Sequence, residues 1–279
     1  MKQNFHLLIL AFCSLFFAPN KAQATEPLSG IFTVNDQGKQ VQFAPGNLQY
    51  VISSGTWQFA ASQTQVVGVS KGYATNHPDN YDVADLFHWD EDYSNSISSD
   101  WRMLTKAEWE YLLREEEPGD GHGPIIAGQA SINGTLNGLM LLPDGWQPFA
   151  TLTFEPSPNN WTTNNYSVAN WEQLETSGVV FLPCVDRYSD NGYYWSATQR
   201  DVATANLIYF YESGIMPDYA AAMDNNYAIR LVRDVKSTPT GVENVQRDNG
   251  QCTKVLRNGQ LFLMYKGTMY DVQGKALKR

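Results

Sequence analysis

The spacing of turn residues constrains this chain most, because recurring Gly, Asn and Pro leave room only for short strands. Apolar and polar residues alternate in Gly30–Val34, Val41–Phe43, Leu48–Val51 and Thr56–Phe59, and turns such as Pro45–Asn47 separate them. A period of two places alternate side chains on one face of a sheet, and short turns join antiparallel neighbours. The opening segment therefore predicts an antiparallel meander.

Two helices are predicted among the strands. Thr105 can cap the first helix while Glu108, three residues later, reaches back to it, and Trp109 belongs to the apolar stripe that follows. The second helix is predicted from a cap at Ser167 to a stop at Gly178. Helices set among antiparallel strands, rather than alternating with parallel ones, indicate the α+β class.

Later apolar and aromatic runs predict the remaining strands of the sheet. Leu139–Leu142 and Val179–Leu182 are each followed by a proline, and Tyr193–Trp195, Leu207–Tyr211 and Tyr227–Val232 follow along the chain. The chain is 43% apolar and only 17% charged, so it has enough apolar side chains to form a core.

The N-terminus has the features of an export signal. Lys2 precedes the apolar run Phe5–Ala18, and Ala22–Ala24 has the small-x-small form of a cleavage site. The run is shorter than the roughly 20 residues of a membrane-spanning helix, and no later segment is long and apolar enough to span. We predict that residues 1–24 are a signal peptide and that the protein works outside the cytoplasm. The alternatives are a buried N-terminal helix and a lipoprotein with Cys13 as the lipidated residue, and Phe12, in place of Gly, Ala or Ser, disfavours the second.

Charge is divided unevenly between two predicted parts. Residues 25–235, the predicted domain, carry 9 Lys and Arg against 26 Asp and Glu, a net charge of −17. Residues 236–279 carry 8 Lys and Arg against 3 Asp and Glu, a net charge of +5. Because an acidic body repels phosphate backbones, nucleic acid is not an expected partner.

The C-terminal part is predicted as a linker, residues 236–248, followed by a short β-strand tail, residues 249–279. Asn258 and Gly259 are a strong hairpin signal between two strand-like segments. A cysteine occurs on each side of the linker, Cys184 and Cys252. An oxidising compartment permits a disulfide between them, and two separate thiols are equally compatible with the sequence.

Two segments resemble a known family. Trp101–Tyr111 is similar to the WRLPTEAEWEY segment of the formylglycine-generating enzyme (sulfatase-modifying factor) family, and Tyr227–Arg233 resembles its closing GFRLVR strand. Phe43–Ala60 and the short tail resemble secreted, non-catalytic relatives in Gram-negative bacteria. The resemblance implies a C-type-lectin-like fold with two helices, antiparallel strands, long loops and a small β tail. It also implies secretion or display on the outer cell surface, with the periplasm as a further location.

The family's catalytic chemistry is not expected here. The enzymes of this family use two cysteines near the end of the domain, whereas this body contains only Cys184 after signal cleavage. His77, His88 and His122 are scattered singly, which does not predict an iron site. Oxygen ligands at Asp79–Asp92 suit calcium, but no EF-hand spacing supports that ion. We predict a protein that is not an enzyme and has no cofactor.

The resemblance implies a ligand face in the loops of the second half of the domain. The candidate ligand-binding residues are Asp186, Arg187, Tyr188, Tyr193, Tyr209, Tyr211 and Tyr219. Tyrosine offers a large, stiff contact surface that suits sugars and proteins. The alternative is that Tyr193, Tyr209 and Tyr211, which alternate along strands, only fill the core or cover the sheet.

Three functions follow from these observations. The first is a secreted or cell-surface recognition module that binds a glycan or protein. The second is a structural or adhesin component of a surface assembly, in which the basic tail docks on an acidic neighbour or on another copy. The third and least favoured is an oxidase of the formylglycine-generating type. The sequence does not predict the oligomeric state.

Overall fold

The computed structural model describes residues 26–89, 93–114, 126–149, 152–156, 159–185, 190–236, 253–257, 260–265, 268–271 and 275–277. The chain divides into two compact units, with the division between Val235 and Lys236. We call them the body and the tail. The predicted signal peptide lies outside the described residues. None of the described helices combines the length and the apolar character that crossing a bilayer requires.

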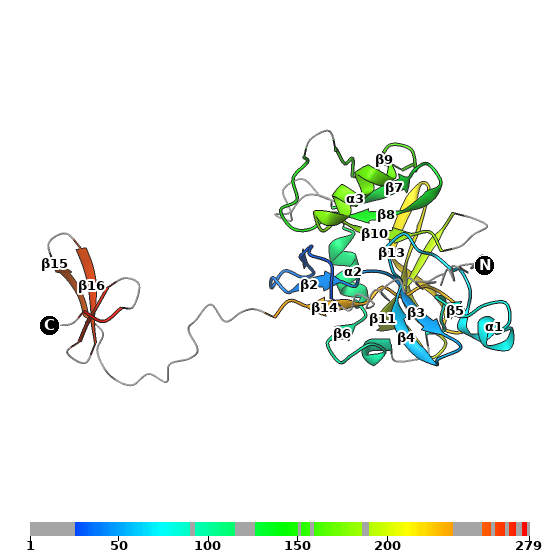
Figure 1. Ribbon diagram of the computed structural model, residues 1–279, viewed down its shortest axis with the longest axis horizontal. Coiled ribbons are helices and arrows are strands. Elements are labelled where there is room, and N and C mark those ends of the chain that lie inside the picture. Colours follow the sequence, from blue (N-terminus) through cyan, green and yellow to red (C-terminus); the bar gives the residue numbers. More distant parts are fainter. Residues whose placement is uncertain are drawn as a thin grey trace, which may run out of the picture. The chain divides into compact units, whose positions relative to one another are not determined.

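The early and late strands of the body share one sheet (Figure 1). Its order is β1 (Phe32–Thr33), β2 (Gln40–Phe43), β14 (Val232–Asp234) and β6 (Trp101–Arg102). Within it, Val232 pairs with Phe43 on one side and with Arg102 on the other. The last strand of the body is therefore held between two strands from its first half.

A second sheet has the order β10 (Val180–Pro183), β8 (Leu136–Leu141), β7 (Ala127–Ile132) and β9 (Asn165–Tyr166). All residues of β7 and β10 are buried. Trp171 packs on Phe181 with ring centroids 5.4 Å apart, so α3 (Val168–Thr176) covers this sheet. β7 and β9 run parallel, which corrects the prediction of antiparallel strands alone.

Both predicted helices are confirmed. The first, α2 (Lys106–Leu112), begins with the predicted capping box: Thr105 Oγ1 accepts from the Glu108 amide (3.2 Å), and Glu108 Oε2 accepts from the Thr105 amide (2.9 Å). Ser167 caps α3, and Gly178 follows its end with φ +89°.

The structure has a third helix, α1 (Lys71–Asn76), and a 3₁₀ turn, η1 (Tyr93–Asn95), so the prediction of two helices was incomplete. α1 is only six residues long, and Ala74 is its one buried residue. Such a helix has no apolar stripe for a sequence pattern to detect. Its visible signal is the cap, since Ser70 accepts from the Tyr73 amide.

Two three-stranded sheets complete the body. One has the order β4 (Thr56–Phe59), β3 (Leu48–Val51) and β5 (Val83–Ala84), and the other β11 (Gly192–Gln199), β12 (Thr204–Tyr211) and β13 (Gly214–Ala222). β13 was not predicted, because it contains Pro217 and many exposed residues; a proline is tolerated there on an edge strand. The predicted strand Tyr227–Val232 is also corrected: regular pairing begins only at Val232, and Tyr227 makes a single bridge to Phe87.

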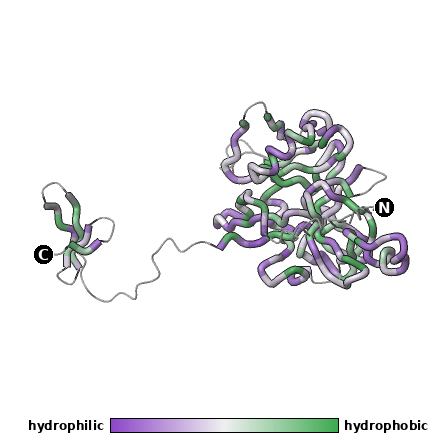
Figure 2. Tube along the Cα trace, viewed as in Figure 1, coloured by the Kyte–Doolittle hydropathy of each residue, from purple (hydrophilic) through white to green (hydrophobic). Residues whose placement is uncertain are grey.

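Buried side chains of the body form large apolar clusters around these sheets, and hydrophobic residues concentrate along the inner strands (Figure 2). The tail is a separate antiparallel sheet of β15 (Thr253–Arg257), β16 (Gln260–Tyr265) and β17 (Thr268–Tyr270). Its first two strands are the two strand-like segments predicted on either side of Asn258 and Gly259. The fold is mixed and sheet-rich with few helices, which is compatible with the α+β class.

Candidate functional site

Five tyrosines from the second half of the body lie in contact on one face of the β11–β12–β13 sheet. We call Tyr193, Tyr209, Tyr211, Tyr219 and Tyr227 the tyrosine cluster. Tyr193 stacks on Tyr209 at 4.7 Å with 10° between the ring planes, and on Tyr227 at 4.7 Å with 15°. Tyr209 stacks in turn on Tyr211 at 5.2 Å and 19°. Four rings therefore form one nearly parallel row, and Tyr219 lies tilted beside Tyr209.

Strand pairing explains this row. Tyr193 of β11 lies directly opposite Tyr209 of β12, and Tyr211 lies two residues further along the same face. Tyr194 and Phe210 point to the other face and are fully buried in the core. Alternation along the two strands thus places Tyr194 and Phe210 in one core cluster, while Tyr193 and Tyr209, on the other face, pack partly buried against a second core cluster that contains Trp195 and Leu207.

Tyr227 joins the row through backbone contacts rather than regular pairing. The amide that follows it, Ala228 N, donates to Tyr193 O (3.1 Å). On its other side Tyr227 exchanges two backbone hydrogen bonds with Phe87 (2.9 and 3.0 Å). These contacts fix the fourth ring of the row next to Tyr193.

The phenols of Tyr193 and Tyr227 are neutral over the physiological pH range. Burial, together with the neighbouring Tyr209 hydroxyl, raises the pKa of Tyr193 to about 12. Burial and the proximity of Tyr219 raise the pKa of Tyr227 as well. Tyr219 is 41% exposed, and the other four tyrosines are half-buried. The row therefore presents uncharged hydroxyl groups that can both donate and accept hydrogen bonds.

A cavity of about 560 Å³ opens beside the end of the row; we call it the side cavity. It is lined by Gly68, Val69, Ser70, Tyr73, Tyr81, Leu86, Val185, Tyr193, Asn226 and Tyr227. Two members of the cluster are thus also walls of the side cavity. None of these lining residues is charged.

Asp85 fixes the loop that forms one wall of the side cavity. This buried carboxylate accepts from the amides of Val67 (2.6 Å), Gly68 (2.8 Å) and Val69 (3.2 Å). Three backbone amides that donate to one buried side chain hold the loop in place.

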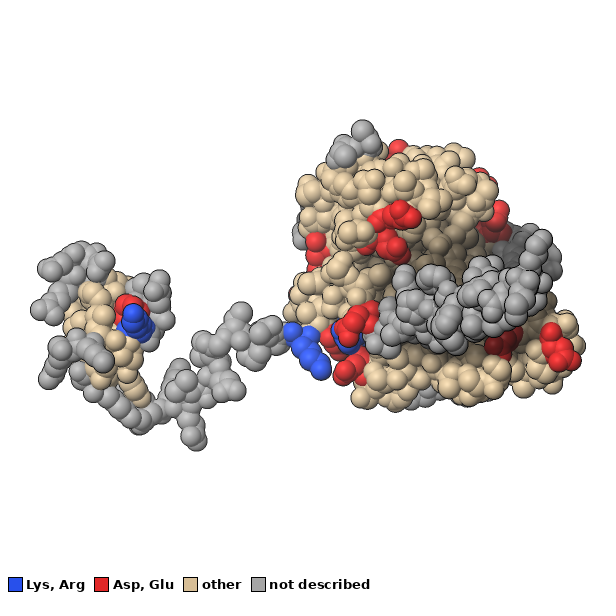
Figure 3. All heavy atoms as spheres, in the orientation of Figure 1, with Lys and Arg blue, Asp and Glu red and all other residues tan. Residues whose placement is uncertain are grey.

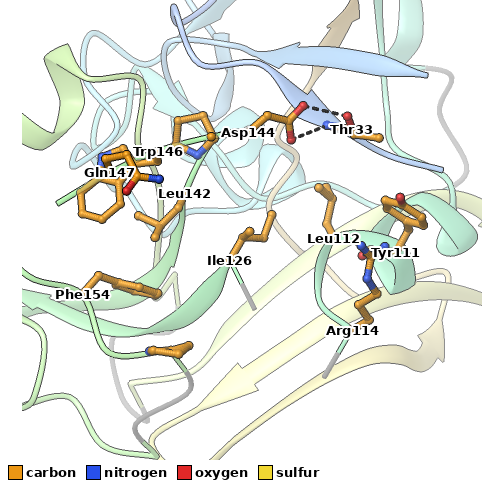
Figure 4. Close-up of a pocket in the computed structure, with 13 residues that line it drawn as sticks. Thr33, Tyr111, Leu112, Arg114, Ile126, Leu142, Asp144, Trp146, Gln147 and Phe154 are labelled. Carbon is orange, nitrogen blue, oxygen red and sulfur yellow. Dashed lines mark hydrogen bonds between the residues drawn. The ribbon is translucent and has the colours of Figure 1, made fainter. Parts of the chain in front are cut away.

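A larger cavity of about 720 Å³ lies elsewhere in the body, between the end of α2 and the segment after β8 (Figure 4). Trp146 and Phe154 lie on one side of it, and the Arg114 guanidinium lies 3.9 Å from the centre of the Tyr111 ring on the other. Asp144 in this cavity accepts from both the amide and the hydroxyl of Thr33. No predicted site residue lines it.

Four predicted site residues come together in the cluster: Tyr193, Tyr209, Tyr211 and Tyr219. The predicted residues Asp186, Arg187 and Tyr188 lie outside the described residues. Tyr227 was missed because it was assigned to the closing strand, where an aromatic residue is expected to fill the core.

Both alternatives for Cys184 and Cys252, a disulfide or two separate thiols, stay untested, because Cys252 lies outside the described residues. Cys184 Sγ donates to the carbonyl of Asp190 at 3.1 Å. Within the described ranges, no group of three or more His, Cys, Asp or Glu side chains could hold a metal ion. That the protein has no cofactor stays a prediction.

No family model, curated protein or solved structure matches this chain. The features of this chain that bear on function are therefore the geometry of the tyrosine cluster and of the side cavity.

Proposed function

We propose that the body is an exported, non-enzymatic recognition domain that binds a neutral glycan through the tyrosine cluster. The row of four stacked rings carries this proposal. Because the rings cover one another's faces, a ligand meets their edges and hydroxyl groups. A row of neutral hydroxyls suits a hydroxyl-rich, uncharged ligand, and the ring stacking spares the entropy cost of ordering each side chain on binding.

We also propose that the body has a C-type-lectin-like fold and is displayed outside the cytoplasm after loss of residues 1–24. Two observations support the fold. The two segments of family resemblance are neighbours in one sheet, where Arg233 pairs with Trp101. The helix predicted within the first segment begins inside it, at Lys106, with the capping box described above.

Binding of residues 25–279 to arrays of neutral and anionic glycans tests the function. We expect binding to neutral glycans, and Tyr209→Ala to weaken it by about 3- to 10-fold because the central ring of the row is lost. Tyr209→Phe keeps the stacking and removes one hydroxyl, so it should weaken binding less. Tyr111→Ala, at the larger cavity, is the matched control and should bind as the wild type does.

Two results would contradict this function. One is a preference for anionic glycans, since the cluster offers them no cation. The other is neutral-glycan binding that Tyr209→Ala leaves unchanged. Failure to bind any glycan would favour a protein ligand instead.

The tail supports a second candidate function, as a structural or adhesin component of a surface assembly. Along β16, Phe262 and Met264 alternate with Leu261 and Leu263, so both faces of the small sheet are apolar. Leu261 is 42% exposed. A three-stranded sheet with apolar side chains on both faces has more apolar surface than it can bury alone, which favours docking on a partner.

A further inference from the structure

We propose that the side cavity binds the terminal, uncharged sugar ring of a glycan whose remaining residues lie along the tyrosine cluster. This inference rests on the proposed function and deepens it, because it assigns one end of the ligand to a particular place. Tyr193 and Tyr227 carry the link, since both line the cavity and both belong to the row. A chain that follows the row past Tyr227 would therefore end in the cavity.

The surroundings of the cavity select against a charged ligand. The nearest cation along the chain is Lys71, whose ammonium lies over the rings of Tyr50 (4.7 Å) and Trp57 (4.9 Å). Two described carboxylates adjoin lining residues along the chain, Asp82 and Asp85: Asp82 Oδ1 accepts from the Ser53 amide (2.9 Å), and both oxygens of Asp85 accept from backbone amides of the wall. These described charges are engaged by the protein, so a charged group in the cavity would lose its hydration without gaining an ion pair from them.

The aromatic walls and the size of the cavity suit a sugar ring. Tyr73 lies against Tyr81 with ring centroids 5.6 Å apart, and its ring also stacks on His77 at 4.4 Å. Tyr73 is 50% exposed, so part of its surface remains available to a ligand. The volume of about 560 Å³ falls within the range of roughly 300–1,000 Å³ that is usual for small-molecule sites.

Asn226 supplies hydrogen-bonding capacity inside the cavity. Its Oδ1 is buried, and no described residue donates to it. Rotation of the amide about its last side-chain bond exchanges the carbonyl and NH₂ ends, so either can turn toward a ligand. A ligand hydroxyl both donates and accepts, and can therefore pair with whichever end faces it.

The walls are held in place before any ligand arrives. Asp85 fixes the Gly68–Val69 wall, and the backbone of Tyr227 is bonded to Phe87 and, through Ala228, to Tyr193. A preformed site loses little conformational freedom on binding, which favours the weak, single-ring contacts that a chain end can make.

The experiment compares single sugar rings with chains by titration calorimetry and ligand-observed NMR on residues 25–279. The probes are the methyl glycosides of glucose, mannose and galactose, and the neutral β-1,4-linked tetrasaccharides of the same sugars. A second set of tetrasaccharides carries a carboxylate at C6 of the non-reducing ring. We expect at least one neutral tetrasaccharide to bind and its carboxylated counterpart to bind at least about 10-fold more weakly, since a charged end ring would be desolvated.

Variants separate the cavity from the row. Tyr73→Ala and Asn226→Ala should each lower the affinity for the neutral tetrasaccharide by about 5-fold or more. Each should also abolish the NMR binding signal of the methyl glycoside. Asn226→Asp places a charge in the cavity at nearly unchanged size and should have the same effect. Tyr209→Ala should lower the affinity for the tetrasaccharide and leave the affinity for the methyl glycoside unchanged. Tyr111→Ala is the matched control. An unchanged melting temperature checks that each variant is folded.

The outcomes distinguish the two proposals. If Tyr209→Ala weakens binding while Tyr73→Ala and both Asn226 variants do not, the side cavity is not a sugar site and the proposed function stands. Equal affinity for the neutral and carboxylated chains also overturns the cavity assignment alone. If no neutral probe binds, or if neither group of variants has an effect, both proposals fail.

Discussion

At the residue scale, Arg230 is the most unusual side chain of the body, because it is fully buried without a carboxylate partner at hydrogen-bonding distance among the described residues. Its guanidinium donates to Asn47 Oδ1 (3.0 Å), to the carbonyls of Ala44 (3.1 Å) and Phe181 (3.0 Å), and to Gln63 Oε1 (3.5 Å). Burial lowers its pKa to about 10, so it remains charged at neutral pH. One cation thus joins the turn before β3 to strand β10.

We expect Arg230→Met to lower the free energy of unfolding by about 3–5 kcal/mol. Methionine fills part of the volume but leaves the buried carbonyls without a donor. Urea denaturation measures the loss. Arg233→Met is the control, because Arg233 pairs with the exposed Glu26 and should cost about 1 kcal/mol or less. Equal losses in the free energy of unfolding for the two variants would show that the buried contacts of Arg230 stabilise the fold no more than the exposed pair of Arg233 does.

The residues of the site could be predicted from the sequence only in part, and strand geometry explains which part. Tyr193, Tyr209 and Tyr211 alternate with apolar residues on two strands, so a shared face follows from local sequence. Tyr227 lies 16 residues beyond Tyr211 and reaches the row through a bridge to Phe87. Asn226 gives no local signal at all. Both depend on long-range contacts that no periodicity encodes.

At the element scale, the start of α2 is tied to three strands by ions. Burial alone would raise the pKa of Glu108, but hydrogen bonds from Arg102 (2.8 and 2.9 Å), from the Thr105 amide (2.9 Å) and from Lys39 (3.0 Å) outweigh burial and lower the pKa to about 2. Arg102 also binds Asp234 of β14 at 2.7 Å. The helix cap therefore helps to join β2, β6 and β14.

Because the folded pKa of Glu108 lies below its unfolded value of about 4.5, its ionised form stabilises the fold above pH 4.5. That stabilisation should disappear as the pH falls toward 2. We expect Glu108→Gln to lose about 2 kcal/mol at pH 7 and to match the wild type near pH 2. Urea denaturation at several pH values measures the difference. Glu110→Gln, on the exposed side of α2, is the control and should change the free energy of unfolding little at any pH. A loss of stability for Glu108→Gln that does not change with pH would contradict this prediction.

Elements with a local signal were predicted, and those without one were not. α2 and α3 begin at side chains that cap their own first turn, so neighbouring residues determine their start. α1 has a cap but no apolar stripe, and β13 contains Pro217. The parallel pair of β7 and β9 joins residues more than 30 positions apart, such as Ile132 and Tyr166. Only the folded chain brings these strands together.

At the scale of the whole molecule, the chain combines two units of opposite charge. Acidic side chains are prominent on the visible face of the body (Figure 3), whose residues 25–235 have a net charge of −17. The tail unit, residues 236–279, has a net charge of +5. Opposite charges favour attraction between the tail of one molecule and an acidic surface elsewhere, and this attraction weakens as salt screens it.

We expect deletion of residues 236–279 to leave the body folded, because each unit has its own internal contacts. The melting temperature of the body and its binding to neutral glycans should not change, whereas retention on the surface of a Gram-negative host should be lost. Fractionation of cells and medium measures retention. Replacing Leu261 and Leu263 with Ser in the full chain keeps the tail's charge and removes apolar contacts. This variant therefore separates the contribution of charge to retention from that of the apolar side chains. Retention that survives the deletion would contradict a docking role for the tail. It would favour glycan binding by the body as the interaction that holds the protein at the surface.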